Sequence, residues 1–264
     1  IVDVVVPSVY YIKDTEEVKY YGNEFRPLTF VAREDGMTVS FTAPCSYSLD
    51  GSTWVELAAN TATPAINTGG TISFRNYVSS TGTSIGTFSS NKTFDLKGNI
   101  MSMLFGQNFI EQNSLVYHRG CFTDLLKMSR VVDASKLYMP ATTLANSCCQ
   151  EMFSGCTSLT QAPELPATTL GDGCYHSMFK GCTSLTQAPE LPATTLIASC
   201  YNSMFRNCTS LGYISMLATD VSASGALSSW VSGVATSGTF VKAAGVTIPS
   251  GASGIPEGWT VEER

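Results

Sequence analysis

The chain has 264 residues, a net charge of −6, 44% hydrophobic residues and 14% charged residues. This composition is too apolar and too weakly charged for a disordered chain. It lacks the lysine and arginine clusters that neutralise phosphate in nucleic-acid-binding proteins, so we expect no nucleic-acid partner. No run of about 18 apolar residues is present, so we expect no transmembrane helix.

We expect that any export signal has been removed from the start of this chain. The chain begins at Ile1 with neither a charged n-region nor an apolar h-region, so we expect a mature or trimmed fragment. Residues 1–24 are expected to form a leading strand and an acidic linker. The nine cysteines are an odd number, so at least one has no intramolecular disulfide partner.

Residues 25–105 are expected to form an antiparallel β-sandwich, because short alternating segments rich in Thr and Ser are separated by turn residues. Asp50-Gly51 is a hairpin-turn signal. The apolar stretch Ile100–Phe109 is expected to join this domain to the next one. The expected strands are Leu28–Arg33, Thr38–Thr42, Ser46–Leu49, Thr53–Leu57, Thr71–Tyr77 and Lys92–Leu96.

Internal repeats dominate the next part of the chain. The segment PATTL recurs three times at a spacing of 26 residues, and GCTSLTQAPEL occurs twice at the same spacing. Three units follow, at 140–165, 166–191 and 192–217, and the first two are identical at 19 of 26 positions. A degenerate unit precedes them, so the repeat region is expected to span 106–217. Residues 218–264 are expected to cap it, with helix-like spacing over Ser222–Val231 and strands at Thr239–Ala243 and Trp259–Val261.

Each unit predicts a short helix followed by a short extended stretch. Apolar residues from Leu144 to Phe153 recur at spacings of one, three and four, as on one face of a helix. Gly155, Gly181 and Asn207 follow, and we expect a positive φ at each, because Gly and Asn most readily end a helix in the left-handed conformation. Stacked units of this kind form a parallel solenoid.

Equivalent residues of stacked units are expected to share one environment. We therefore expect buried columns of leucine, phenylalanine and cysteine. A helix between the two cysteines of a unit would hold them too far apart for a disulfide, so we expect buried thiols. The columns are Leu159, Leu185 and Leu211; Phe153, Phe179 and Phe205; Cys148, Cys174 and Cys200; and Cys156, Cys182 and Cys208.

The sequence predicts no catalytic, cofactor-binding or metal site, and it leaves the ligand-binding residues unknown. The histidines are His118 and His176. His176 follows Cys174 by two residues, but its column holds Gln150 and Asn202, which indicates a solvated surface. Glu164 and Glu190 share a column with Met216, which favours a solvated edge over a carboxylate pair.

The motifs MFSGCTSLTQAPELPATTL and MFKGCTSLTQAPELPATTL resemble the leucine-rich repeats of BspA-like surface proteins of gut Bacteroidetes. The ending GTFVKAAG…GIPEGWTVEE and the segments SYSLDGSTWVEL and GNIMSMLFGQNF are also similar to parts of that family. The resemblance implies an α+β fold with an N-terminal antiparallel β-sandwich followed by a short leucine-rich-repeat solenoid of strand-plus-helix units. It also implies an exported protein at the outer cell surface or in the extracellular medium, with a lipid anchor upstream of residue 1 as one option.

Two functions remain open, and neither is enzymatic. The first is a cell-surface binding or adhesion module whose partner is a host or cell-surface protein or glycan. The second is a carbohydrate-binding accessory protein that uses exposed aromatic residues of the β-sandwich, such as Tyr77, Trp54 or Tyr47. Ordinary strand packing is the simpler interpretation of these aromatics.

Overall fold

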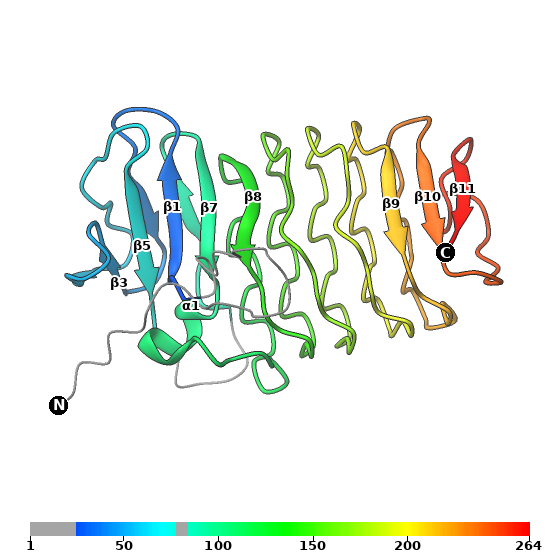
Figure 1. The fold of residues 1–264 in the computed structure, drawn as a ribbon, viewed down its shortest axis with the longest axis horizontal. Coiled ribbons are helices and arrows are strands. Elements are labelled where there is room, and N and C mark those ends of the chain that lie inside the picture. Colours follow the sequence, from blue (N-terminus) through cyan, green and yellow to red (C-terminus); the bar gives the residue numbers. More distant parts are fainter. Residues whose placement is uncertain (1–24, 78–83) are drawn as a thin grey trace, which may run out of the picture.

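The computed structural model describes residues 25–77 and 84–264 of the chain. Over these residues successive segments of chain lie side by side along one long axis (Figure 1). The leading strand and linker expected over 1–24 lie outside the described residues. The elements are β1 (Leu28–Ala32), β2 (Val39–Phe41), β3 (Cys45–Ser48), β4 (Val55–Leu57), β5 (Thr71–Arg75), β6 (Phe88–Ser90), β7 (Phe94–Asn99), α1 (Ser102–Phe105), the 3-10 helix η1 (Gly106–Asn108), β8 (Val131–Tyr138), β9 (Tyr213–Met216), β10 (Thr239–Lys242) and β11 (Thr260–Glu263).

The leading strands form a six-stranded sheet in the order β4-β3-β5-β1-β7-β8 and a two-stranded sheet of β2 and β6. Neighbours from β4 to β7 are antiparallel. All six strands expected between residues 28 and 96 are present, with shifted ends. Gly51 lies in the loop between β3 and β4 with a φ of 78°, as the Asp50-Gly51 turn predicts.

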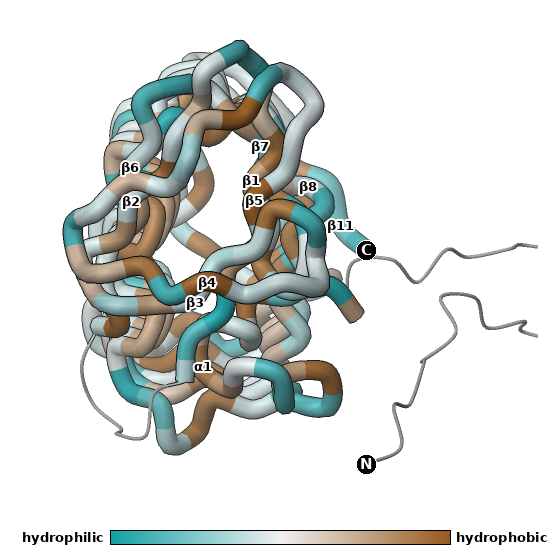
Figure 2. The backbone as a smooth tube through the Cα atoms, turned by 90° about the vertical axis from the view of Figure 1, so that its left-hand side faces the viewer, coloured by the Kyte–Doolittle hydropathy of each residue, from teal (hydrophilic) through white to brown (hydrophobic). Residues whose placement is uncertain are grey.

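Phenylalanine rings join the two sheets. Phe88 of β6 stacks on Phe41 with ring centroids 4.3 Å apart, and it meets Phe30 of β1 at 5.0 Å. Seen end-on, β2 and β6 lie on one side of the molecule and β1, β5 and β7 on the other (Figure 2). The expectation of a separate β-sandwich is nevertheless wrong, because β7 pairs in parallel with β8 and carries the same sheet onward toward the repeats.

The expected leucine-rich-repeat solenoid of strand-plus-helix units is also wrong, since no helix forms in the repeat units. The one α-helix of the described residues is α1, which has four residues and lies before the repeats. The segments expected to be helical consist of consecutive turns, and so does the helix-like stretch from Ser222 to Val231. Their left-handed residues recur every fourth position, namely Ser147, Glu151 and Gly155; Gly173, Ser177 and Gly181; Ser199, Ser203 and Asn207; and Gly225, Ser229 and Gly233.

With a left-handed residue at every fourth position, the backbone forms a hydrogen-bond pattern that differs from that of a helix. One set of N–H groups closes local turns, as when Gln150 donates to the Ser147 carbonyl at 3.2 Å. The alternate set donates to the next unit, as when Glu151 donates to the His176 carbonyl at 2.8 Å. Consecutive units are therefore joined by a backbone ladder, which satisfies polar groups that a helix would have satisfied within itself.

The expected side-chain columns are confirmed. Phe179 stacks between Phe153 and Phe205 at centroid distances of 5.5 and 5.7 Å, and the three leucines of their column are fully buried. All nine cysteines are buried free thiols. The second cysteine column also binds the preceding unit, because the Cys182 thiol donates to the Phe153 carbonyl at 3.1 Å. Gly155, Gly181 and Asn207 have the expected positive φ, although they end turns and not helices.

The C-terminal residues close the stack with a parallel three-stranded sheet in the order β11-β10-β9. The two strands expected in this region are β10 and β11. Bridges from Asp133 to Gln161 and from Gln187 to Tyr213 place the extended stretches of the units between β8 and β9. The strands and these stretches thus follow one another along the molecule, and we call their outward surface the strand face (Figure 1).

Candidate functional site: a groove on the strand face

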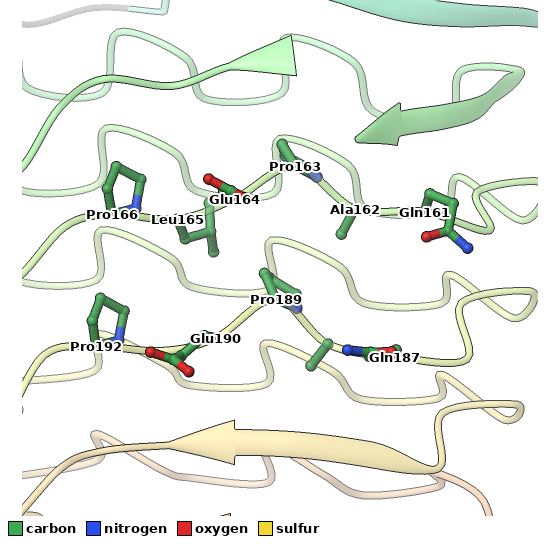
Figure 3. A pocket seen from close by; sticks show the side chains of 11 residues that line it. Gln161, Ala162, Pro163, Glu164, Leu165, Pro166, Gln187, Pro189, Glu190 and Pro192 are labelled. Carbon is green, nitrogen blue, oxygen red and sulfur yellow. The ribbon is translucent and has the colours of Figure 1, made fainter. Parts of the chain in front are cut away.

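Two copies of the sequence Gln-Ala-Pro-Glu-Leu-Pro lie in the middle of the strand face, at residues 161–166 and 187–192. Figure 3 shows the two segments running alongside each other, with each residue of one copy directly above the equivalent residue of the other. In each copy the leucine is buried, which anchors the segment to the core, and the glutamate is exposed. The third unit replaces this sequence with the regular strand β9.

Proline explains why these two segments are not strands. Each copy has two prolines, which lack the N–H needed for a sheet ladder. Residues 161–166 still bond to β8, where the Ala134 N–H donates to the Gln161 carbonyl at 2.9 Å, and 187–192 bond to β9, where the Leu191 N–H donates to the Ser215 carbonyl at 2.9 Å. Among the described residues, no backbone hydrogen bond joins the two segments to each other.

The interrupted ladder leaves a groove of about 580 Å³ between the two copies. Proline rings provide rigid apolar walls, while carboxamides and carboxylates provide hydrogen-bonding groups. Because both copies have the same sequence, the same groups line both sides of the groove (Figure 3). The lining residues are Gln161, Ala162, Pro163, Glu164, Leu165, Pro166, Gln187, Ala188, Pro189, Glu190 and Pro192.

The two glutamates of the groove differ in their partners. Arg264 follows β11, and its guanidinium pairs with both carboxylate oxygens of Glu190, at 2.8 and 3.0 Å. Among the described residues, Glu164 has no ion-pair partner within 4.0 Å, although it occupies the same position of the preceding unit. The groove therefore has one neutralised and one unpaired carboxylate.

The aromatic residues proposed for carbohydrate binding have three different environments. Tyr47 is buried, and the Arg75 guanidinium lies 4.1 Å from the centre of the Trp54 ring, which covers that face of the indole. Tyr77 is 72% exposed and lines a smaller pocket of about 300 Å³ together with Arg75 and Glu56. Of the three, Tyr77 has the most accessible ring.

The two histidines have different environments in the described residues. His118 packs edge-on against Phe105 at 5.1 Å, and burial lowers its pKa. His176 lies at intermediate exposure on a turn, whereas Cys174 is fully buried in the core. In the described part of the chain, no three His, Cys, Asp or Glu side chains are close enough together to hold a metal ion.

Sequence reasoning identified the glutamate column but not the groove or the Arg264 contact. The duplicated prolines were the available signal, because two prolines in each of two neighbouring strands must interrupt the ladder. The Arg264 contact joins residues 74 positions apart and leaves no local pattern in the sequence.

Comparison with protein-family models, curated protein sequences and solved structures gave no match to this chain. In the described residues, no helix has the length and apolar character needed to cross a membrane.

Proposed function

We propose that this chain is a non-catalytic binding module of an exported surface protein, and that the groove between the two Gln-Ala-Pro-Glu-Leu-Pro copies contacts its partner. The observation that carries this proposal is the groove itself, which combines rigid proline walls with repeated polar groups. The absence of a nucleophile–base pair from the sequence and its resemblance to BspA-like surface proteins support the same function. The partner is a protein or glycan of a cell surface.

The test is binding of the fluorescently labelled protein to intact cells, measured by flow cytometry. The groove variant is Gln161→Ala/Glu164→Ala/Gln187→Ala, which changes exposed side chains that lie outside the core. We expect saturable binding by the wild type and at least a fivefold loss in the variant. A matched triple variant at Thr168, Thr194 and Thr195, which are exposed residues outside the groove lining, should bind like the wild type. Equal binding by the groove variant and the wild type would reject the groove.

Pretreatment of the cells identifies the class of partner. Loss of binding after surface proteolysis indicates a protein, and loss after mild periodate oxidation without proteolysis indicates a glycan. Absence of saturable binding to any tested cell surface would reject the binding function as a whole.

A second candidate is carbohydrate binding at the Tyr77 pocket. The exposed tyrosine ring offers a stacking surface, and Glu56 and Asn76 offer hydrogen-bonding groups beside it. A glycan array tests this function, with Tyr77→Ala expected to abolish binding. Trp54→Ala is the less direct variant, because Arg75 already lies against its ring.

A further inference from the structure

Three cations gather on the strand face beside the groove: two are on the strands that join the leading sheet to the repeats, and one lies just before β1. Lys97 of β7 and Lys136 of β8 are register partners in neighbouring parallel strands. Arg26 lies just before β1, and its carbonyl accepts the Asn99 N–H at 2.7 Å, two residues beyond Lys97. Arg26 and Lys136 are exposed, and Lys97 is half-buried. We call these three residues the cationic cluster.

The cluster has no counter-charge in the described residues. None of the ion pairs within 4.0 Å involves Arg26, Lys97 or Lys136. Other cations of the sheets have partners, such as Arg33 with Asp95 and Lys242 with Glu263.

The nearest carboxylates along the two strands are engaged elsewhere. Asp95 lies two residues before Lys97, and its carboxylate accepts the Arg33 Nε–H at 2.6 Å. Asp133 lies three residues before Lys136, and its carboxylate accepts the Ser135 N–H at 2.7 Å. In the described residues, neither carboxylate forms an ion pair with a cation of the cluster.

This arrangement disfavours the folded protein when no anion is present. Like charges directly opposite one another on neighbouring strands are destabilising. Burial and the two neighbouring cations, Arg26 and Lys136, lower the pKa of Lys97. Such a cluster is stabilised when an external anion binds, and the binding free energy then includes relief of the repulsion.

We infer that the cationic cluster binds the carboxylate or sulfate groups of an acidic polysaccharide. The site is a part of the open strand face and not a cavity, which suits an extended chain better than a small ion. Bridging from Asp133 to Gln161 places β8 next to the first groove segment. The half-exposed ring of Tyr138, which is the register partner of Asn99, borders the cluster.

Nucleic acid is the less suitable polyanion. Its affinity depends on neutralising many closely spaced phosphates, and three cations on an acidic chain neutralise few of them. An acidic polysaccharide with one or two charges per disaccharide needs fewer cations and also offers hydroxyl groups for hydrogen bonding.

The test is titration of the whole protein with heparin oligosaccharide and with hyaluronan oligosaccharide, with neutral dextran and single-stranded DNA as comparisons. We expect saturable binding of at least one acidic oligosaccharide and none of dextran. Lys97→Ala/Lys136→Ala should weaken binding at least tenfold and flatten its dependence on salt. Lys180→Ala/Arg206→Ala removes the same charge from exposed residues on the turns and should change affinity less than twofold.

Three outcomes would overturn the inference: no binding of either acidic oligosaccharide at low salt, equal losses in the two double variants, or single-stranded DNA bound more tightly than both oligosaccharides. The cluster variant and the groove variant share no residue. The experiments can therefore reject the cationic cluster without rejecting the groove, and the reverse. Circular dichroism of each double variant verifies that the fold is retained.

Discussion

At the residue scale, the left-handed positions determine the structure of the repeats. Apolar residues of each unit recur in pairs every four positions, as in Leu144-Ala145, Cys148-Cys149 and Met152-Phe153. An α-helix has 3.6 residues per turn, so a strict period of four would drift around its surface. The four-residue spacing of the apolar pairs matches the spacing of the left-handed residues. This spacing was the feature of the sequence that distinguishes these turns from a helix.

Gly181 tests this conformation directly. Its φ is 75°, and a Cβ at this position would meet its nearest neighbour, the Gly155 Cα, at an ordinary 3.8 Å. Space is therefore available, and backbone conformation decides the outcome. We expect Gly181→Val to be less stable than Gly181→Asn by about 1–2 kcal/mol, because β-branched residues are strained at positive φ. Asn207 adopts this conformation in the next unit. Urea unfolding measures the difference, and equal stabilities would contradict the assignment.

Phe179 tests the stacked columns. Its ring is fully buried between two parallel phenylalanine rings. Phe179→Ala should lower the free energy of unfolding by about 3–5 kcal/mol, because it removes apolar contacts and leaves a cavity. Lys180→Ala is the matched control at the next, exposed position, and it should change stability by no more than about 0.5 kcal/mol. If Phe179→Ala lowered the free energy of unfolding by less than about 1 kcal/mol, the phenylalanine column would not be part of the stabilising core.

At the element scale, strands were easier to predict than the connections between them. The alternating Thr- and Ser-rich segments predicted β1 to β5 and β7, because alternation reports a half-buried strand. The short strand β6 and the strand β8 were not predicted. β8 lies in the degenerate unit, and its pairing with β7 joins residues far apart in sequence, which no local pattern reveals. The groove likewise depends on which segments become neighbours.

The pairing of β7 with β8 gives a prediction on stability. Lys136→Glu places a carboxylate opposite Lys97 and replaces repulsion with attraction, so we expect the free energy of unfolding to rise by about 0.5 kcal/mol. Lys136→Gln removes only the repulsion and should give a smaller gain. Both should lose acidic-oligosaccharide binding if the cluster is a site. Urea unfolding at low salt measures the effect. Destabilisation by Lys136→Glu would show that there is no significant charge repulsion between Lys97 and Lys136.

At the scale of the whole molecule, the sequence predicted the buried columns but not the fold class. Identical phase in successive units was sufficient to predict that Phe153, Phe179 and Phe205 stack. It was not sufficient to distinguish a helix from turns, because both bury the same apolar residues. Because the units form turns and not helices, backbone hydrogen bonds connect each unit to the next.

Two of the buried thiols, Cys156 and Cys208, make the stability of the stack depend on alkaline pH. Burial raises the pKa of Cys156 from 9.0 to about 11 and that of Cys208 from 9.0 to about 12. In the unfolded chain these thiols ionise near pH 9, whereas in the folded protein they stay protonated. Their stabilising contribution is therefore complete below pH 9 and is lost as the pH rises toward 11–12. Each such thiol lowers the free energy of unfolding by about 1.4 kcal/mol per pH unit in this range.

Urea unfolding between pH 8 and about 10.5, in reductant, measures this dependence. The wild type should lose stability steeply above pH 9, the ordinary thiol value. The variant Cys156→Ala/Cys208→Ala should be less stable at pH 8 but should lose less stability per pH unit, because two titrating groups are gone. Lys97 has the opposite effect, because a lowered lysine pKa makes the free energy of unfolding rise with pH. Both proteins contain Lys97, so its effect cancels when their pH profiles are compared. Parallel pH profiles for the two proteins would mean that these thiols ionise as readily in the folded stack as in the unfolded chain, which their burial opposes.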